Sequence, residues 1–87
     1  MEKMYQIMAQ KSGCSARRLL LIHGHCEEYA IQYFNDWAYN WIWEKTTPES
    51  DEVFNKLVES NFSLKQFYYD STRYWVDEVE VDNESKP

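Results

Sequence analysis

The side chains with the most reactive chemistry lie in the first third of the chain. Cys14, His23, His25 and Cys26 are of the types that bind zinc, and a cysteine beside a histidine can form a thiol nucleophile. Their spacing suits neither role. The sequence has no Cys-x-x-Cys pair, and on a helix the His25 side chain would point away from the face that His23 and Cys26 share. We therefore expect no metal, no cofactor and no catalytic residue, with both cysteines reduced and buried as small apolar side chains.

Other catalytic patterns are also missing. The sequence has no glycine-rich phosphate loop, and none of its serines lies in a nucleophile elbow. Carboxylates are so frequent after residue 26 that accidental pairs are certain and indicate nothing. We expect a protein that binds and does not catalyse.

Nucleic-acid recognition is a second candidate. The stretch from Tyr5 to Gly24 resembles the helix-turn-helix motif of bacterial and phage repressors, on the residues Ala9, Gly13, Cys14, Leu19 and Ile22. The resemblance implies that Ser15, Ala16 and Arg17 face the major groove, and it makes Ser15, Arg17 and Arg18 the candidate nucleic-acid-binding residues. Leu20 and Leu21 stand where such a helix usually has polar groups, which favours an ordinary helical hairpin packed into the core.

The pattern weighted most heavily is an excess of aromatic residues on a polar helix face. Residues 26–45 have the strongest helical period, with Ala30, Phe34, Trp37 and Trp41 on the apolar half. Tyr39 and Trp43 fall among the acidic residues of the opposite half, and Tyr29 lies at its edge. Because tyrosine and tryptophan are enriched at interface centres, we predict a partner-binding surface. Its candidate residues are Tyr29, Asp36, Tyr39, Trp43, Glu49, Asp51, Glu52 and Glu59.

The elements that must position these residues are predicted to be helical. The two glycines and two prolines are too few for the turns of an all-β domain. We expect an all-α bundle of four to five helices, over residues 2–11, 15–23, 26–45, from Thr47-Pro48 to about 60, and 64–79. A carboxy-terminal β-hairpin over residues 64–81, within an α+β fold, is the alternative. Residues 1–81 form the single domain, and residues 82–87 are expected to be a disordered tail.

Charge and hydropathy bound the kind of partner. The net charge is −6, but residues 1–25 have four basic residues and one acidic residue, whereas residues 26–87 have five basic and fourteen acidic ones. No apolar run approaches the length of a membrane span and no secretion signal is recognisable, so we expect a cytoplasmic protein that does not interact with membranes. An acidic body argues against coating nucleic acid, which requires many lysines and arginines.

These observations favour a small inhibitor or regulator that docks an acidic, aromatic surface on a larger partner with a basic, nucleic-acid-binding surface. In overall character the chain resembles the anti-CRISPR and anti-restriction inhibitors of phages, and this resemblance implies that the partner's nucleic-acid site is occupied. Self-association as a homodimer is the other use of the same surface. The alternative function is a helix-turn-helix transcriptional regulator that dimerises through its aromatic carboxy-terminal part.

Overall fold

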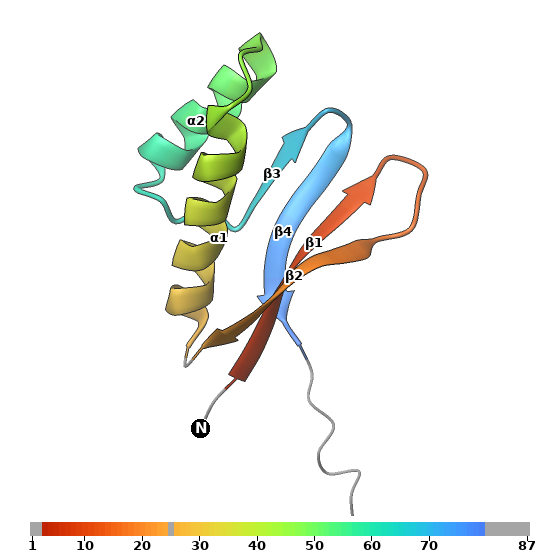
Figure 1. Ribbon diagram of the computed structural model, residues 1–87, viewed down its shortest axis with the longest axis vertical. Helices are drawn as coiled ribbons and strands as arrows, with labels where there is room; N and C mark the ends of the chain where they lie inside the picture. Colours follow the sequence, from red (N-terminus) through yellow and green to blue (C-terminus); the bar gives the residue numbers. More distant parts are fainter. Residues whose placement is uncertain (1–2, 25, 80–87) are drawn as a thin grey trace, which may run out of the picture.

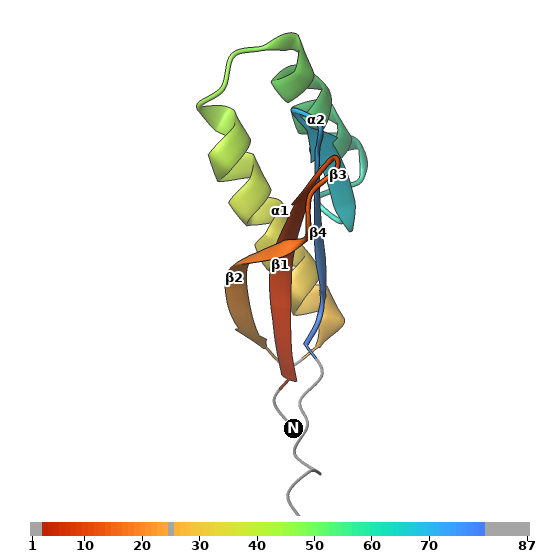
Figure 2. The same ribbon diagram turned by 90° about the vertical axis from the view of Figure 1, so that its right-hand side faces the viewer.

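The computed structural model describes residues 3–24 and 26–79, and these form four strands and two helices (Figure 1). In chain order the elements are β1 (Lys3–Lys11), β2 (Arg17–Gly24), α1 (Glu27–Trp43), α2 (Pro48–Glu59), β3 (Gln66–Tyr69) and β4 (Thr72–Glu78). Both helices lie on one side of the sheet, and in the turned view they lie behind the strands (Figure 2). The described residues therefore form a two-layer α+β structure in which neither helix covers the second face of the sheet.

All four strands are antiparallel, in the order β2-β1-β4-β3. Each hairpin contributes one central and one edge strand, and the two hairpins meet where Ile7 pairs with Val76 and Ala9 with Tyr74. The register of β1 against β2 shifts after Ile7, which pairs with Leu20 while Met8 pairs with Arg18. Leu19 is thus the extra residue of a β-bulge, which bends β2 and strengthens its twist.

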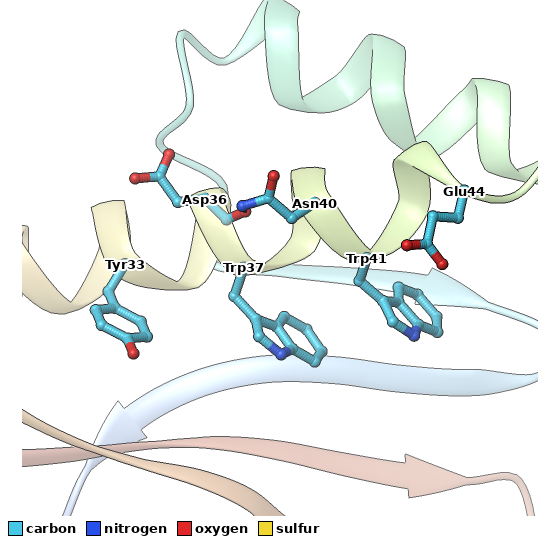
Figure 3. A pocket seen from close by; sticks show the side chains of 6 residues that line it. All are labelled: Tyr33, Asp36, Trp37, Asn40, Trp41 and Glu44. Carbon is cyan, nitrogen blue, oxygen red and sulfur yellow. The ribbon is translucent and has the colours of Figure 1, made fainter.

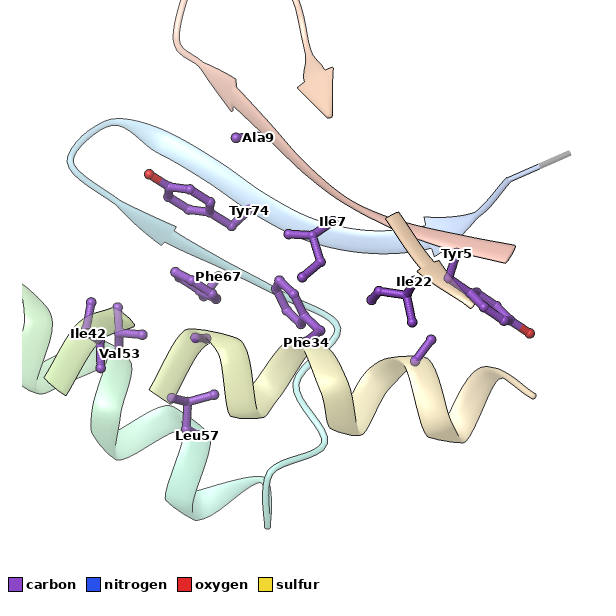
Figure 4. Packing of buried hydrophobic residues seen from close by; sticks show 12 residues of the cluster. Tyr5, Ile7, Ala9, Ile22, Phe34, Ile42, Val53, Leu57, Phe67 and Tyr74 are labelled. Carbon is purple, nitrogen blue, oxygen red and sulfur yellow. The ribbon is translucent and has the colours of Figure 1, made fainter. Parts of the chain in front are cut away.

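The core lies between the sheet and the helices (Figure 4). Alternate residues of β1, namely Tyr5, Ile7 and Ala9, are buried against the helices, whereas Met4 and Met8 point to the uncovered face and are half-buried. The remaining buried apolar residues come from every other element: Ile22, Ala30, Phe34, Ala38, Ile42, Val53, Leu57, Phe67 and Tyr74. All the described elements therefore share one hydrophobic core.

Helix α1 is fastened to the chain beyond α2 by a buried amide. The Asn35 side chain is fully buried; its Nδ2 donates to the carbonyl oxygens of Ile31 (2.6 Å) and Leu64 (2.9 Å). Its Oδ1 accepts from the Leu64 amide at 3.0 Å. The Asn35 side chain therefore provides hydrogen-bond partners for both the amide and the carbonyl of Leu64, whose backbone lies outside the strands.

Local signals define α2 and the last hairpin. Thr47 and Ser50 form a capping box at the start of α2, with Pro48 at its first position, so the helix start predicted at Thr47-Pro48 is confirmed. Asp70 and Ser71 both have positive φ (55° and 60°), and they connect β3 to β4 by a tight two-residue turn.

Several predictions are wrong. The fold is not an all-α bundle: residues predicted as helices over 2–11 and 15–23 form β1 and β2, and the helix predicted over 64–79 is the hairpin β3–β4. The alternative of a carboxy-terminal hairpin describes that segment correctly. The strand pair also removes the two helices that the helix-turn-helix resemblance requires, because Ser15 lies in the connection before β2 and Arg17 and Arg18 lie in β2 itself.

Two further expectations concern the ends of the chain and the membrane. The tail predicted at residues 82–87 lies outside the described residues. Within the part of the chain that the structure describes, neither helix has the length and apolar character needed to cross a bilayer.

Candidate partner-binding surface

The helices and their connections, residues 26–63, form a strongly acidic layer that we call the helix layer. It contains eight acidic residues and two basic ones, Lys45 and Lys56. Among residues 3–24 and 26–79 one ion pair forms, and it lies in the sheet, between Lys3 Nζ and Glu78 Oε2 at 3.9 Å. No carboxylate of the helix layer therefore has an ionic partner among the described residues, so the layer presents a negative potential to the solvent.

An open groove of about 500 Å³ runs along α1 (Figure 3). One row of aromatic rings, Tyr33, Trp37 and Trp41, leaves the helix toward the strands, and Asp36 and Asn40 leave it on the other side. Both rows have a spacing of four residues, which places neighbouring side chains about 6 Å apart along the helix axis. We call this the aromatic groove, and its lining residues are Tyr33, Asp36, Trp37, Asn40, Trp41 and Glu44.

The two indoles of the groove are held rigidly by the sheet. Trp37 and Trp41 lie almost parallel, with an interplanar angle of 3° and ring centroids 5.8 Å apart. The Tyr74 ring of β4 contacts both, at 6.1 Å and 5.2 Å between centroids, and Tyr69 of β3 meets Trp41 edge-on at 5.3 Å. These packed contacts fix the rings before any partner arrives, which lowers the entropic cost of binding.

A second aromatic surface lies where α1 meets α2. Trp43 is 65 % exposed, and its ring contacts Tyr39 (5.6 Å) and Phe54 of α2 (6.4 Å). A smaller hollow of about 220 Å³ lies beside it, next to Asp51 and Lys45. We call Tyr39, Trp43, Asp51 and Phe54 the Trp43 patch. Its exposed indole beside a carboxylate is the arrangement predicted from sequence for Trp43.

The predicted partner-binding residues do not all lie on one surface. Tyr39 is half-buried and packs against Phe54 and Phe62, so of the two predicted rings only Trp43 is largely exposed. Tyr29, 46 % exposed, lies 14 residues before Trp43 on α1, and this separation is about 21 Å along the helix. Asp36 belongs to the aromatic groove. The exposed carboxylates of Glu52 and Glu59 lie on α2.

Glu49 has a structural contact of its own. Its Oε2 accepts a hydrogen bond from the Asp70 amide at 2.7 Å, which connects the first turn of α2 to the β3–β4 turn. This carboxylate is therefore engaged within the molecule, whereas those of Asp51 and Glu52 accept no side-chain hydrogen bond from the described residues.

Sequence reasoning missed the aromatic groove because it assigned Trp37 and Trp41 to the core. Both are half-buried, and Tyr33 is 41 % exposed. The signal that could have identified the groove is the polar row Asp36, Asn40 and Glu44, which has the same four-residue spacing as the rings and lies about 60° from them around the helix.

The uncovered face of the sheet, which we call the open face, differs from the helix layer in its polar contacts. Arg18 Nε donates to Gln6 (3.0 Å), Gln6 Nε2 donates to Asp77 (3.0 Å), and Asp77 also accepts from Trp75 Nε1 (3.0 Å). Arg73 donates to Gln66 at 2.8 Å and covers the Trp75 ring at 4.3 Å. The charged groups in the middle of this face are therefore partnered inside the molecule.

The groups that suggested chemistry are spread apart. Cys14 and Cys26 are both exposed, not buried as expected, and the eight-residue strand β2 separates them by roughly 26 Å, too far for a disulfide or a shared metal. His25 lies outside the described residues. Among the residues that are described, no three histidine, cysteine or acidic side chains come together as metal ligands.

Two tyrosines have perturbed acidity, and both belong to the core. Burial raises the pKa of Tyr74, which the nearby Arg17 guanidinium partly lowers. Burial, and then the Glu78 carboxylate, raise the pKa of Tyr5. Each phenol therefore keeps its proton to a higher pH in the folded protein than an exposed tyrosine does.

Comparison with known proteins gives no relative from which a function could be transferred. No protein-family model, no curated protein sequence and no solved structure matches this chain.

Proposed function

We propose that this protein is a non-enzymatic inhibitor or regulator that docks its helix layer on a basic surface of a larger protein. The observation that carries the proposal is the combination, in one layer, of exposed aromatic rings, Trp43 above all, with eight carboxylates that have no ionic partner within residues 3–24 and 26–79. The field of the carboxylates steers a basic partner into contact, and the rings then supply the buried anchors that give a complex its lifetime.

The charge distribution favours a protein over a nucleic acid as the partner of this layer. Phosphates are repelled by the same carboxylates that attract lysine and arginine. A partner whose basic surface holds phosphate would lose that surface on docking, and inhibition would follow from occupancy alone.

The test compares two variants of equal net charge. One neutralises four exposed acids of the helix layer: Asp36→Asn, Glu44→Gln, Asp51→Asn and Glu52→Gln. The control adds four positive charges to the exposed connection of the first hairpin and its margin: Gln10→Lys, Ser12→Lys, Ser15→Lys and Ala16→Lys.

Each protein is immobilised, and proteins retained from a lysate are quantified at low and at high salt. We expect the wild type and the control to retain the same partner and to lose it as salt rises, and the neutralised variant to retain about tenfold less. Equal retention by the neutralised variant, or no protein retained by the wild type, contradicts the proposal.

A further inference from the structure

The chemistry of the aromatic groove selects among the segments that a basic partner could insert. Tyr33, Trp37 and Trp41 offer three aromatic rings, and the lining also has two carboxylates, with Glu44 beside the Trp41 end of the ring row and Asp36 on the other side of the helix. An aliphatic segment would cover the rings, but it would remove water from the two carboxylates without giving them a partner, which costs free energy. An acidic segment or a phosphate would be repelled.

The molecule itself shows that a ring of this groove binds a cation. Lys45 Nζ lies 4.5 Å from the centroid of the Trp41 ring. Within residues 3–24 and 26–79 the other such contact is that of Arg73 with Trp75 on the open face. Trp37 and Tyr33 thus form the part of the groove that no described cation covers.

Arginine fits this arrangement better than lysine does. Its planar guanidinium can stack on an indole and donate two parallel hydrogen bonds to a carboxylate, and its methylene stem covers aromatic surface. The groove repeats about every 6 Å, and side chains on the same side of an extended segment are separated by nearly the same distance, roughly 6.6 Å. Arginines at alternate positions of such a segment therefore match the rings of α1.

We propose that the aromatic groove binds an extended arginine-rich segment of a protein, with some guanidinium groups stacked on its rings and others paired with its carboxylates, Asp36 and Glu44. This inference rests on the proposed function, because it identifies which part of the helix layer receives the partner and what that part recognises.

The test is calorimetric titration of the whole protein with a synthetic peptide of alternating arginine and serine. We expect the double variant Asp36→Asn with Glu44→Gln to weaken binding about tenfold, since two ion pairs are lost. The matched variant, Asp51→Asn with Glu52→Gln, removes the same charge from α2 and should change the dissociation constant less than about twofold. Lys45→Gln should tighten binding, because it uncovers the second indole.

Three results would overturn the assignment of the groove. They are unchanged binding by the groove variant, equal weakening by the α2 variant, and equal affinity for a peptide in which lysine replaces arginine. The lysate experiment separates this failure from that of the proposed function. If the α2 variant loses the partner and the groove variant retains it, the helix layer binds its partner outside the groove. If the peptide binds the groove but the lysate yields no partner, the proposed function is wrong and the assignment of the groove stands.

Discussion

The open face and the helix layer differ in whether their charged side chains have partners within the molecule. On the open face Arg18, Asp77 and Arg73 are joined to neighbouring amides and to Trp75 by hydrogen bonds and a cation–π contact. On the helix layer the carboxylates are numerous and have no ionic partner among the described residues. The helix layer therefore has more charged groups without an ionic partner in the described part of the chain, and this difference is the basis for proposing it as the binding surface.

The largest effect is expected where the helix layer joins the chain that leads into the sheet. Asn35→Ala would leave the amide and carbonyl of Leu64 without their buried partner, and we expect the free energy of unfolding to fall by about 2–4 kcal/mol. The control is Asn40→Ala one turn later, whose exposed amide donates to the Asp36 carbonyl and should cost under about 0.5 kcal/mol. Urea unfolding measures both, and equal losses would show that the Asn35 contacts do not join the layers.

A smaller effect should distinguish the charges of the two faces. Asp77→Ala removes the acceptor of two hydrogen bonds on the open face, and we expect a loss of about 1 kcal/mol. Glu52→Ala removes a carboxylate without such contacts from α2 and should stay within about 0.5 kcal/mol of the wild type. Thermal unfolding of the two variants tests this difference between the faces. A larger loss of stability in Glu52→Ala than in Asp77→Ala would contradict it.

The smallest effect concerns how the free energy of unfolding depends on pH, and it arises on the covered side of the sheet. Because burial raises the pKa of Tyr74, the folded state holds the phenolic proton more tightly than the unfolded chain. This contribution is fully present below pH about 10 and is lost as pH rises through the folded-state pKa. Tyr74→Phe should reduce the alkaline fall in unfolding free energy. Equal slopes of unfolding free energy against pH in the wild type and in Tyr74→Phe would contradict this assignment.

Both helices of the described part of the chain could be predicted from the sequence. Residues 26–45 were predicted as the central helix, and α1 spans Glu27–Trp43, because its apolar residues follow the helical period over more than four turns. The start of α2 follows from Thr47 and Pro48, whose chemistry acts locally and does not depend on the rest of the fold.

The strands could not be predicted, and the reason differs between the hairpins. In β1 the uncovered positions hold Met4 and Met8, so both faces of the strand read as apolar and the two-residue alternation is hidden. In the last hairpin the buried residues have odd numbers in β3 (Phe67) and even numbers in β4 (Tyr74). The two-residue turn causes this change, because it pairs odd-numbered residues of β3 with even-numbered residues of β4. A single alternation read across both strands therefore fails.

The scarcity of glycine was also misleading. Asn61, Phe62, Asp70 and Ser71 all adopt positive φ without being glycine, so tight turns occur where the sequence shows no glycine. Of the predicted surface, Trp43 is an exposed indole and Asp36 lies in the groove, but the groove itself depends on where the sheet ends beside α1. No local pattern contains that information.

The bulge at Leu19 has a consequence for how the sheet ends. Edge strands are templates on which further chains can stack. One edge, β3, is only four residues long, and the other, β2, is eight residues long but is bent at Leu19 and has Arg17 and Arg18 at its start. Short length disfavours pairing of another strand with the first edge, and the bend at Leu19 with the two arginine charges disfavours it at the second.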